Sequence, residues 1–517
     1  MPSPLDNLQS ALTMLSFEAI WSALTYPWQK ARAQAEWTPE GERIKGLKRS
    51  VAYGAQAVRL GRGSGSRPAW PKTWQRSGAI RYVHLTDRGV RLSGAEGTIE
   101  VALLASDLVR IRYLRPGADA DAEPMSYAIQ RPLATWSIPP FVCIQHPTAC
   151  LLQTSDLVVG ITLASSQVFF ATPDGALMHS DVEAAWADNG ALRHRVALAP
   201  GERIFGLGER ATPHNRRGRT HVLWNTDPAG YRSGDDPINL NMPVSVHIVP
   251  AGDGRKLSSL TFYDNPTYAE FDLGSSIPNV AEHRFAGGEL RYYFAVGPLP
   301  QLLERYTELT GRHPLQPLWM LGYHQSRWSY DTEARIRKLA RDFREQRVPC
   351  DAIHLDIDYM EGFRCFTWDR RSCTEPALMA ADLREMGIKL ISIIDPGIKR
   401  DPDYEVYREG LAGGHFCTTP DGQVFHAPVW PGYSAFPDFT NPATRRWWGQ
   451  LYRPLLETGI AGFWNDMNEP SAFAAIGDRT LPDTVRHAME GAGGTHAEAH
   501  NIYGMQMVRA TREGLEA

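Results

Sequence analysis

The sequence has 517 residues, and roughly 150 residues per domain would give about three domains. Its formal net charge is −4, from 54 Lys and Arg against 58 Asp and Glu, which excludes the strongly basic surface of a nucleic-acid or anionic-membrane binder. Aromatic residues are abundant, with 15 Trp, 19 Tyr and 18 Phe, and such rings either fill cores or lie against the CH faces of sugars.

The N-terminal segment and the cysteines indicate in which cellular compartment the protein is found. The first 31 residues lack the basic cluster of a signal peptide, and the chain has no run of about 18 apolar residues. The six cysteines form no C-x-x-C pair, which indicates reduced thiols and no structural zinc site. We therefore expect a cytoplasmic protein with no membrane partner. Residues 1–70 are interpreted as a helical extension followed by a linker.

Residues 71–310 contain many short runs of β-forming residues separated by turn residues. This pattern predicts an antiparallel β-sandwich domain. The clearest expected strands are 99–104, 108–113, 157–163, 167–171, 245–249, 257–263 and 290–296.

Residues 311–517 instead alternate apolar strands with amphipathic helices, which favours a parallel sheet. The expected strands are 318–324, 352–358, 389–395 and 460–465, and the expected helices lie at 331–346, near 377–386 and near 502–514. A stretch rich in Gly, Pro and aromatic residues, 396–445, is too long for a simple connection and is interpreted as an inserted subdomain.

Acidic residues follow three consecutive strands of this second part. Asp356 follows the second expected strand, Asp395 the third, and Asp466 with Glu469 the fourth. The carboxyl ends of parallel strands meet at one edge, and clustered carboxylates repel one another, so a structural reason for this pattern is hard to find. The pattern indicates a functional cluster.

Two chemistries use such a cluster. His354, Asp356 and Asp358 share one side of a strand and could bind a metal, but only His324 offers a further histidine, so we interpret His354 as a core residue and predict no metal. Glycoside hydrolysis with retention instead needs two carboxyl groups roughly 5–5.5 Å apart. The abundance of aromatic residues favours this second chemistry.

Short motifs then carry a resemblance to glycoside hydrolase family 31 in its α-glucosidase form. The main one is GFWNDMNEPSAF at 462–473, the nucleophile signature of that family. The others, in family order, are GLGER at 206–210, WNTD at 224–227, LGYHQSRWSY at 321–330, DIDYM at 356–360, FTWD at 366–369, IIDPGI at 393–398, VWPG at 429–432, FPDFTNP at 436–442 and HNIYG at 500–504. The resemblance covers about residues 95–517. It implies a galactose-mutarotase-like β-sandwich followed by the first half of a catalytic (β/α)8 TIM barrel.

The resemblance also implies roles for single residues. Asp466 resembles the catalytic nucleophile, and Glu469 the second acid of the signature, with a loop-bracing role as its alternative. Asp356, for which Asp358 is an alternative, and Asp395 resemble the carboxylates that bind sugar hydroxyls in subsite −1. The expected walls of that pocket are Trp328, Trp430, Trp464 and Met467, and Asp227 resembles a sandwich-loop residue of subsite +1. No cofactor or metal is expected.

We therefore predict a retaining α-glucosidase that acts on terminal non-reducing α-linked glucose of oligosaccharides. In the family the general acid/base aspartate lies on a later barrel strand, and Asp478 and Asp483 are interpreted as surface residues. We thus expect a truncated chain that is inactive alone. The alternatives are an α-transglucosidase, α-xylosidase or α-glucan lyase of the family, or a non-catalytic carbohydrate-binding relative. No oligomeric state is predicted.

Overall fold

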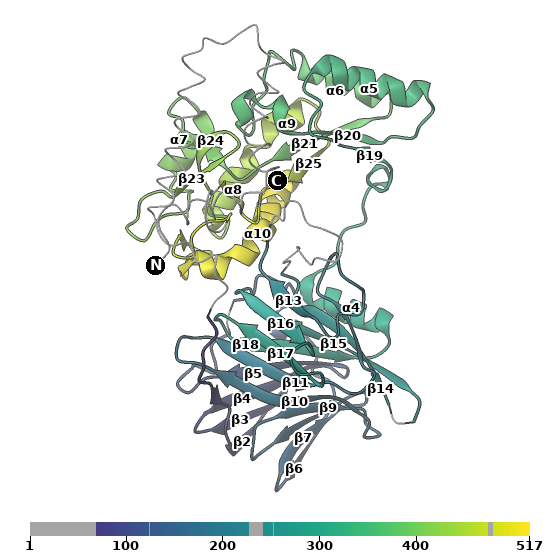
Figure 1. The fold of residues 1–517 in the computed structure, drawn as a ribbon, viewed down its shortest axis with the longest axis vertical. Coiled ribbons are helices and arrows are strands. Elements are labelled where there is room, and N and C mark those ends of the chain that lie inside the picture. The colour runs from purple at the N-terminus through teal and green to yellow at the C-terminus, as the bar shows by residue number, and fades with distance from the viewer. Residues whose placement is uncertain (1–68, 124, 227–240, 252, 474–478) are drawn as a thin grey trace, which may run out of the picture.

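The computed structural model describes residues 69–123, 125–226, 241–251, 253–473 and 479–517. The helical extension expected within residues 1–70 lies almost wholly outside these described residues. The described chain folds into an all-β part and an α/β part, which Figure 1 shows one above the other.

The all-β part consists of two packed antiparallel sheets. The ten strands of the first sheet are β1 (Gln75–Arg76), β6 (Val142–His146), β7 (Ala149–Gln153), β8 (Val158–Thr162), β9 (Val168–Ala171), β10 (Leu177–Trp186), β11 (Leu192–Ala197), β13 (Thr220–Leu223), β16 (Ala269–Leu273) and β17 (Val280–Phe285). The eight strands of the second sheet are β2 (Ile80–Thr86), β3 (Gly89–Gly94), β4 (Gly97–Ala105), β5 (Leu108–Leu114), β12 (Arg203–Gly206), β14 (Val244–Pro250), β15 (Lys256–Tyr263) and β18 (Leu290–Val296). The predicted antiparallel β-sandwich is confirmed.

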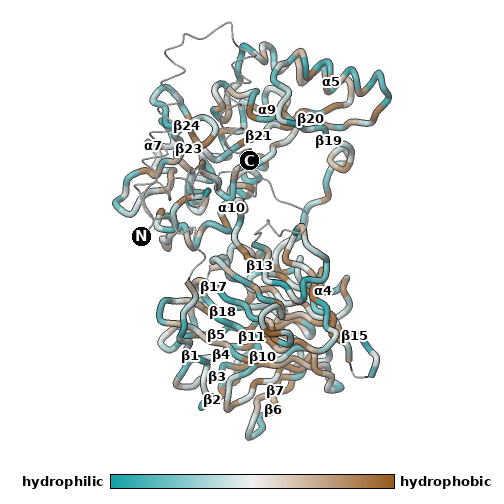
Figure 2. The backbone as a smooth tube through the Cα atoms, in the orientation of Figure 1, coloured by the Kyte–Doolittle hydropathy of each residue, from teal (hydrophilic) through white to brown (hydrophobic). Residues whose placement is uncertain are grey.

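The core between the two sheets follows from the alternation of side chains along the strands. In β14 and β17 every second residue is buried, as a strand with one core face requires. The inward residues of both sheets form one hydrophobic cluster, which includes Leu92, Ile111, Phe170 and Phe294. Figure 2 shows hydrophobic segments along these strands and hydrophilic loops between them.

Strands β5 and β18 are an exception, because all seven residues of each are buried. Their outer face is covered by α4 (Leu299–Thr310) and by the segment around the 3-10 helix η1 (Leu133–Thr135), whose side chains form a second small core with Leu108 and Ala295. A strand that is covered on both faces must also bury whatever polar residues it carries.

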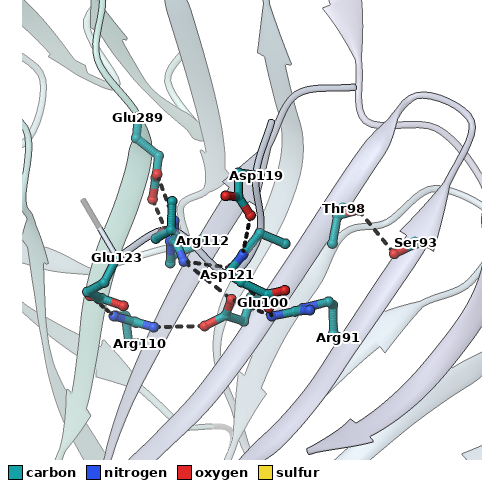
Figure 3. Close-up of polar contacts among 12 residues, drawn as sticks. Arg91, Ser93, Thr98, Glu100, Arg110, Arg112, Asp119, Asp121, Glu123 and Glu289 are labelled. Atoms are coloured by element: carbon teal, nitrogen blue, oxygen red, sulfur yellow. Dashed lines mark hydrogen bonds and ion pairs between the residues drawn. The ribbon is translucent and has the colours of Figure 1, made fainter. Parts of the chain in front are cut away.

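Strand β5 carries two such residues, and a network of charges compensates for their burial (Figure 3). Arg110 donates to Glu100 at 2.7 Å and to Glu123. Arg112 donates to Glu289 at 2.7 Å and to the second oxygen of Glu100 at 3.3 Å. Both arginines are at most 2% exposed, so each depends on these carboxylates.

The α/β part contains a four-stranded parallel sheet in the order β19-β20-β21-β25. Its strands are β19 (His324–Gln325), β20 (Ala352–Leu355), β21 (Lys389–Ile394) and β25 (Gly462–Asn465). The helices are α5 (Glu333–Glu345), α6 (Pro376–Glu385), α7 (Glu405–Ala412), α8 (Pro442–Gln450), α9 (Arg453–Glu457) and α10 (His496–Glu516). Parallel strands joined by helices confirm the predicted partial (β/α)8 barrel. None of the helices in the described ranges combines the length and hydropathy that a membrane crossing requires.

Short elements fill the connections of this part. Between β21 and α8 a three-stranded sheet is formed by β22 (Ile398–Lys399), β23 (His426–Val429) and β24 (Gly432–Ala435). The remaining elements are η2 (Leu318–Leu321), η3 (Ile357–Tyr359), η4 (Glu361–Phe363), η5 (Met489–Gly491), β26 (Arg486–His487) and β27 (Gly494–Thr495).

The expected barrel strands are longer than those observed, and the first two differ most from the structure. Residues 318–324 were expected to form the first strand, but η2 occupies most of this segment, and β19 has only two residues. Pro317 precedes η2 and has no N–H for a ladder, and Leu318 is 85% exposed. The second strand ends at Leu355, because the carboxylate of Asp356 accepts the N–H of Ile357 at 2.7 Å and starts η3.

The charge network on β5 gives a first test. Glu100→Gln should lower the free energy of unfolding by about 3 kcal/mol, since it leaves two buried arginines short of a charged partner. Urea unfolding followed by circular dichroism measures this change. Arg453→Ala is the matched control: it removes an ion pair with Glu457 whose side chains are 83% and 64% exposed, and should change stability by about 0.5 kcal/mol or less. Equal effects of the two variants would contradict this account of β5.

Candidate active site

Three carboxylates lie where neighbouring strands of the parallel sheet end. Asp356 follows β20, Asp395 follows β21, and Asp466 follows β25. The register pairs Ile394 with Asn465, and the N–H of Asp466 donates to the carbonyl of Ile394 at 3.1 Å. The sheet therefore brings the three strand-end acids together at one edge, as expected.

The pKa of Asp356 reports this proximity. Burial, together with the charges of Asp466 and Asp358, raises that pKa to about 6, although the N–H of Ile357 acts in the opposite direction. A carboxyl group with this pKa exchanges its proton near neutral pH.

Asp395 is the most enclosed of the three. It is 6% exposed, and burial, then the charges of Asp466, Asp356 and Glu469, raise its pKa well above the usual value. Its Oδ1 atom is buried and has no hydrogen-bond partner among the described residues. The thiol of Cys365 donates to the main-chain carbonyl of Asp395 at 3.2 Å and helps to fix that strand end. A buried carboxylate oxygen without a donor can accept a hydrogen bond from a hydroxyl.

Asp466 is positioned by its neighbour in the chain. The side-chain carbonyl of Asn465 accepts from Thr511 of α10 at 3.0 Å and from Tyr452 at 3.3 Å. After Asp466 the chain turns sharply at Met467, whose φ is 57°, and the N–H of Ser471 donates to the carbonyl of Met467 at 3.0 Å. This turn is what brings Glu469 back toward the strand ends.

Glu469 is braced within the same loop. The hydroxyl of Ser471 donates to its Oε2 atom at 2.5 Å. Its charge is also one of those that raise the pKa of Asp395. Glu469 is therefore both a loop-bracing carboxylate and an electrostatic neighbour of the cluster.

The expected aromatic residues lie in two groups. The rings of Trp328 and Trp430 are 5.4 Å apart, and Phe473 meets Trp430 edge-on at 4.9 Å. Trp464 lies on β25, and His354 approaches its ring edge-on at 6.1 Å. Trp430, Trp464 and Met467 pack partly against the barrel core, whereas Trp328 is 44% exposed. Phe473 is an addition to the expected wall, and only its place at the end of the nucleophile motif signals it.

Potential metal ligands converge elsewhere. Two buried groups in the described parts of the chain bring ligand atoms within 4.8 Å of one another: His179 with Asp181 and His194, and Cys417 with Asp438 and His487. Neither contains a strand-end carboxylate. His354 instead has its Nε2 atom 3.1 Å from Nδ1 of His324, a contact between two imidazoles.

Asp227 lies outside the described residues, but the chain just before it does not. Trp224 stacks on His500 of α10, with ring centroids 3.7 Å apart and an angle of 7° between the rings. The N–H of Asn225 donates to Asn501 Oδ1 at 2.8 Å. The chain therefore contacts the barrel two residues before Asp227.

The sequence patterns assign no role to His487, His496 or Asn501, although all three are buried. Asn501 lies within the HNIYG motif at 500–504, and the signal for His496 is spacing, because His496 and His500 are four residues apart and so lie on the same side of a helix.

Comparisons with known proteins agree with this architecture. Two family models match in chain order: the N-terminal galactose mutarotase-like domain of glycosyl hydrolase 31 over residues 98–272, and the TIM-barrel domain of glycosyl hydrolases family 31 over residues 313–517. Alpha-glucosidase 2 of Bacillus thermoamyloliquefaciens is 42% identical over 319 residues, which are 61% of this chain and 39% of that protein. An alpha-glucosidase of Saccharolobus solfataricus is 31% identical over 332 residues, 60% of this chain and 47% of that protein.

A solved structure is also similar. The family 31 dextranase of Flavobacterium johnsoniae, complexed with glucose, superimposes with a TM-score of 0.77 at 28% identity, over 85% of this chain and 53% of that one. The present chain thus spans about half or less of the length of these relatives. Both family models match in chain order, and the sheets and strand ends have the expected layout. The chain therefore belongs to glycoside hydrolase family 31.

Proposed function

We propose that this chain carries the nucleophile side of the active site of a retaining α-glucosidase, which releases terminal non-reducing glucose from α-linked oligosaccharides. The observation that carries the proposal is the cluster of Asp356, Asp395 and Asp466 at adjacent strand ends, where one buried oxygen of Asp395 has no donor within the part of the chain that the structure describes. Two relatives of this chain are named alpha-glucosidases, and these names support a glucoside as the substrate.

In this proposal Asp466 is the nucleophile. Its carboxylate attacks the anomeric carbon as the bond to the leaving oxygen breaks, the general acid gives its proton to that oxygen, and a β-linked glycosyl-enzyme forms. Water then attacks the same carbon from the opposite side and gives a proton back to the general acid/base, the bond to Asp466 breaks, and the product keeps the α configuration. Glu469 supports the nucleophile through its charge.

Asp356 and Asp395 bind hydroxyls of the same sugar. A hydroxyl that donates to Oδ1 of Asp395 satisfies the buried acceptor, and the positive charge that develops on the sugar relieves the repulsion among the three carboxylates. The repulsion is thereby lower in the transition state than in the free enzyme. Such a difference is what accelerates the chemical step.

The remaining expected residues complete the pocket. Trp328, Trp430, Trp464 and Met467 form its walls, and Asp227 contacts the sugar in subsite +1. Asp358 is the alternative to Asp356 as a hydroxyl ligand.

We also propose domain boundaries at 71–310 for the sandwich and 311–517 for the barrel part, with a subdomain inserted at about 396–445.

In the described parallel sheet, β19 and β25 each pair with a neighbouring strand on one side only. Full activity should therefore require further strands that close the barrel and supply the general acid. Other outcomes within the family, such as transglucosylation or α-xyloside hydrolysis, remain the alternatives. A cytoplasmic location remains a prediction.

The nucleophile assignment predicts the effect of Asp466→Asn in the enzyme with its barrel closed. Turnover of an aryl α-glucoside should fall by about 10⁴-fold or more, because a neutral amide cannot form the glycosyl-enzyme. Added azide should restore turnover and give the β-glucosyl azide, identified by NMR. Turnover within about tenfold of the unsubstituted enzyme would contradict the assignment.

The cluster also predicts how Asp356 titrates. Its carboxyl carbon, followed by ¹³C NMR, should show a pKa of about 6, and Asp466→Asn should lower this pKa because a neighbouring negative charge is gone. A raised pKa in the folded state stabilises the protein below the unfolded pKa, so the contribution of Asp356 to stability should be lost as the pH rises from about 4 to about 6.

Asp331→Asn is the control for this titration, because Asp331 lies on the surface before α5 and pairs with Arg335. It should leave the pKa of Asp356 unchanged. An unchanged pKa in Asp466→Asn as well would mean that the two carboxylates do not interact.

A further inference from the structure

A cavity of about 200 Å³ lies on the outer face of the eight-stranded sheet, between β5 and β18 and the segments that cover them. One water needs roughly 10–15 Å³ of such space, so the cavity has room for a much larger molecule. Its floor is formed by side chains that are at most 4% exposed: Leu104, Arg110, Arg291, Tyr293 and Leu309.

The polar part of this floor comes from two paired strands. Arg110 of β5 lies directly opposite Tyr293 of β18 in the register, and Arg291 lies two residues before Tyr293 on the same strand. Side chains two residues apart on a strand share a face, so the three polar groups all lie on the covered outer face of the sheet. The floor is therefore polar at its centre, with leucines beside it.

The rim of the cavity includes one cation and one carboxylate, Arg131 and Glu123. The guanidinium of Arg131 is held in place, because it lies 3.9 Å from the centre of the Trp136 ring and pairs with Glu308. Glu123 accepts from Arg110 through Oε1, and its side chain is 56% exposed. The second oxygen of Glu123 can therefore accept from a ligand at the mouth of the cavity.

The charges around the cavity are balanced. Each of the three arginines that line it already has a carboxylate partner: Arg110 pairs with Glu100 and Glu123, Arg291 with Asp264 at 2.7 Å, and Arg131 with Glu308. A negatively charged ligand would have to compete with these carboxylates, which would also repel it. The balance therefore favours a neutral ligand.

The hydroxyl of Tyr293 is the group of the floor that a ligand would complete. It forms no hydrogen bond with any residue in the described parts of the chain, although Asp264, Arg291 and Arg110 all lie near enough to act on it by charge. Burial, then the charge of Asp264, raises the pKa of Tyr293 to about 12, so the hydroxyl keeps its proton and can both donate and accept. A buried hydroxyl of this kind is stabilised when a ligand supplies the missing hydrogen bond.

These features together define the ligand. It is neutral, it accepts from guanidinium groups and donates to Glu123, and it presents apolar surface to Leu104, Leu133 and Leu309. A sugar ring meets all three conditions, because each hydroxyl both donates and accepts, and the CH groups of the ring are apolar.

We propose that this cavity is a second carbohydrate site, which binds one neutral sugar ring through Tyr293, Arg110 and Glu123. None of the three strand-end carboxylates lines the cavity. The inference therefore goes beyond the proposed function and does not depend on it.

The site can be tested on the 517-residue chain with ¹³C-labelled tyrosine rings and methyl α-glucoside as the probe. The ring signal of Tyr293, assigned through Tyr293→Phe, should shift and reach saturation as the sugar is added. The same shift should persist in Asp395→Asn, which disables the proposed sugar site at the strand ends. Absence of a saturable shift, or its disappearance in Asp395→Asn, would overturn the proposal.

Two variants test the cavity itself by saturation-transfer NMR observed on the sugar, with Asp395→Asn present in every protein. Tyr293→Phe keeps the ring but loses the hydroxyl, and it should weaken binding by about three- to tenfold, the effect of one hydrogen bond. Leu133→Trp should fill the cavity from its rim and abolish binding. Tyr82→Phe is the matched control, since Tyr82 is 73% exposed on the edge strand β2, and it should leave the affinity unchanged. Equal affinities in all three variants would contradict the assignment.

A small anion is the competing occupant, because three arginines line the cavity. Inorganic phosphate should leave the Tyr293 signal unchanged, since its charge would lie beside Glu123 and Asp264. A saturable shift with phosphate and none with the sugar would replace the proposal by an anion site. None of these measurements involves turnover, so their failure is distinct from a failure of the nucleophile assignment.

Discussion

Repulsion among carboxylates at the ends of β20, β21 and β25 is the constraint on which the rest of the structure depends. Burial and mutual charge raise the pKa of Asp356 and of Asp395, so each ionised carboxylate makes the ionisation of its neighbours less favourable. The surrounding structure holds the three groups in place regardless, because β20 and β21 are almost fully buried in the barrel core and β25 is paired with β21. Under the proposed function this stored repulsion is released as positive charge develops on the sugar.

Helix α10 links this cluster to the sandwich. Near its C-terminal end Gly514 packs against Gly449 of α8, where a Cβ on Gly514 would lie 2.2 Å from the Gly449 backbone, so the two helices cross at close range. Thr511 of the same helix braces Asn465, the residue before Asp466. In its first two turns His500 and Asn501 hold the sandwich loop at Asn225. One helix thus supports both the strand end of Asp466 and Asn225 of the sandwich part.

The parts of the structure that the sequence predicts are those governed by local pattern. Alternating apolar residues predict the sandwich strands, and acids after three apolar strands predict that Asp356, Asp395 and Asp466 meet, because strand direction alone brings these ends together. The first barrel strand was overestimated, because apolar residues at 318–321 suggested burial that Pro317 and the exposed Leu318 do not have.

Other features depend on contacts between segments far apart in the chain. His500 and Asn225 are 275 residues apart, so no local pattern predicts their hydrogen bond. Likewise, the burial of Arg110 and Arg112 depends on Glu289, which is remote in sequence, and on Glu100 of the neighbouring strand. Charged residues on a strand normally indicate a solvent-exposed face, and only the tertiary structure shows that this face is covered.

The central claim is that Asp466 attacks the sugar, and trapping the covalent intermediate tests it most directly. A 5-fluoro-α-glucosyl fluoride suits this purpose, because fluoride leaves without protonation while the ring fluorine slows both steps, so the nucleophile is tested separately from the general acid. After incubation and proteolysis, mass spectrometry locates the label. The account predicts a 5-fluoroglucosyl ester on Asp466 that is absent in Asp466→Asn. A label on Asp356, Asp395 or Glu469 would contradict it.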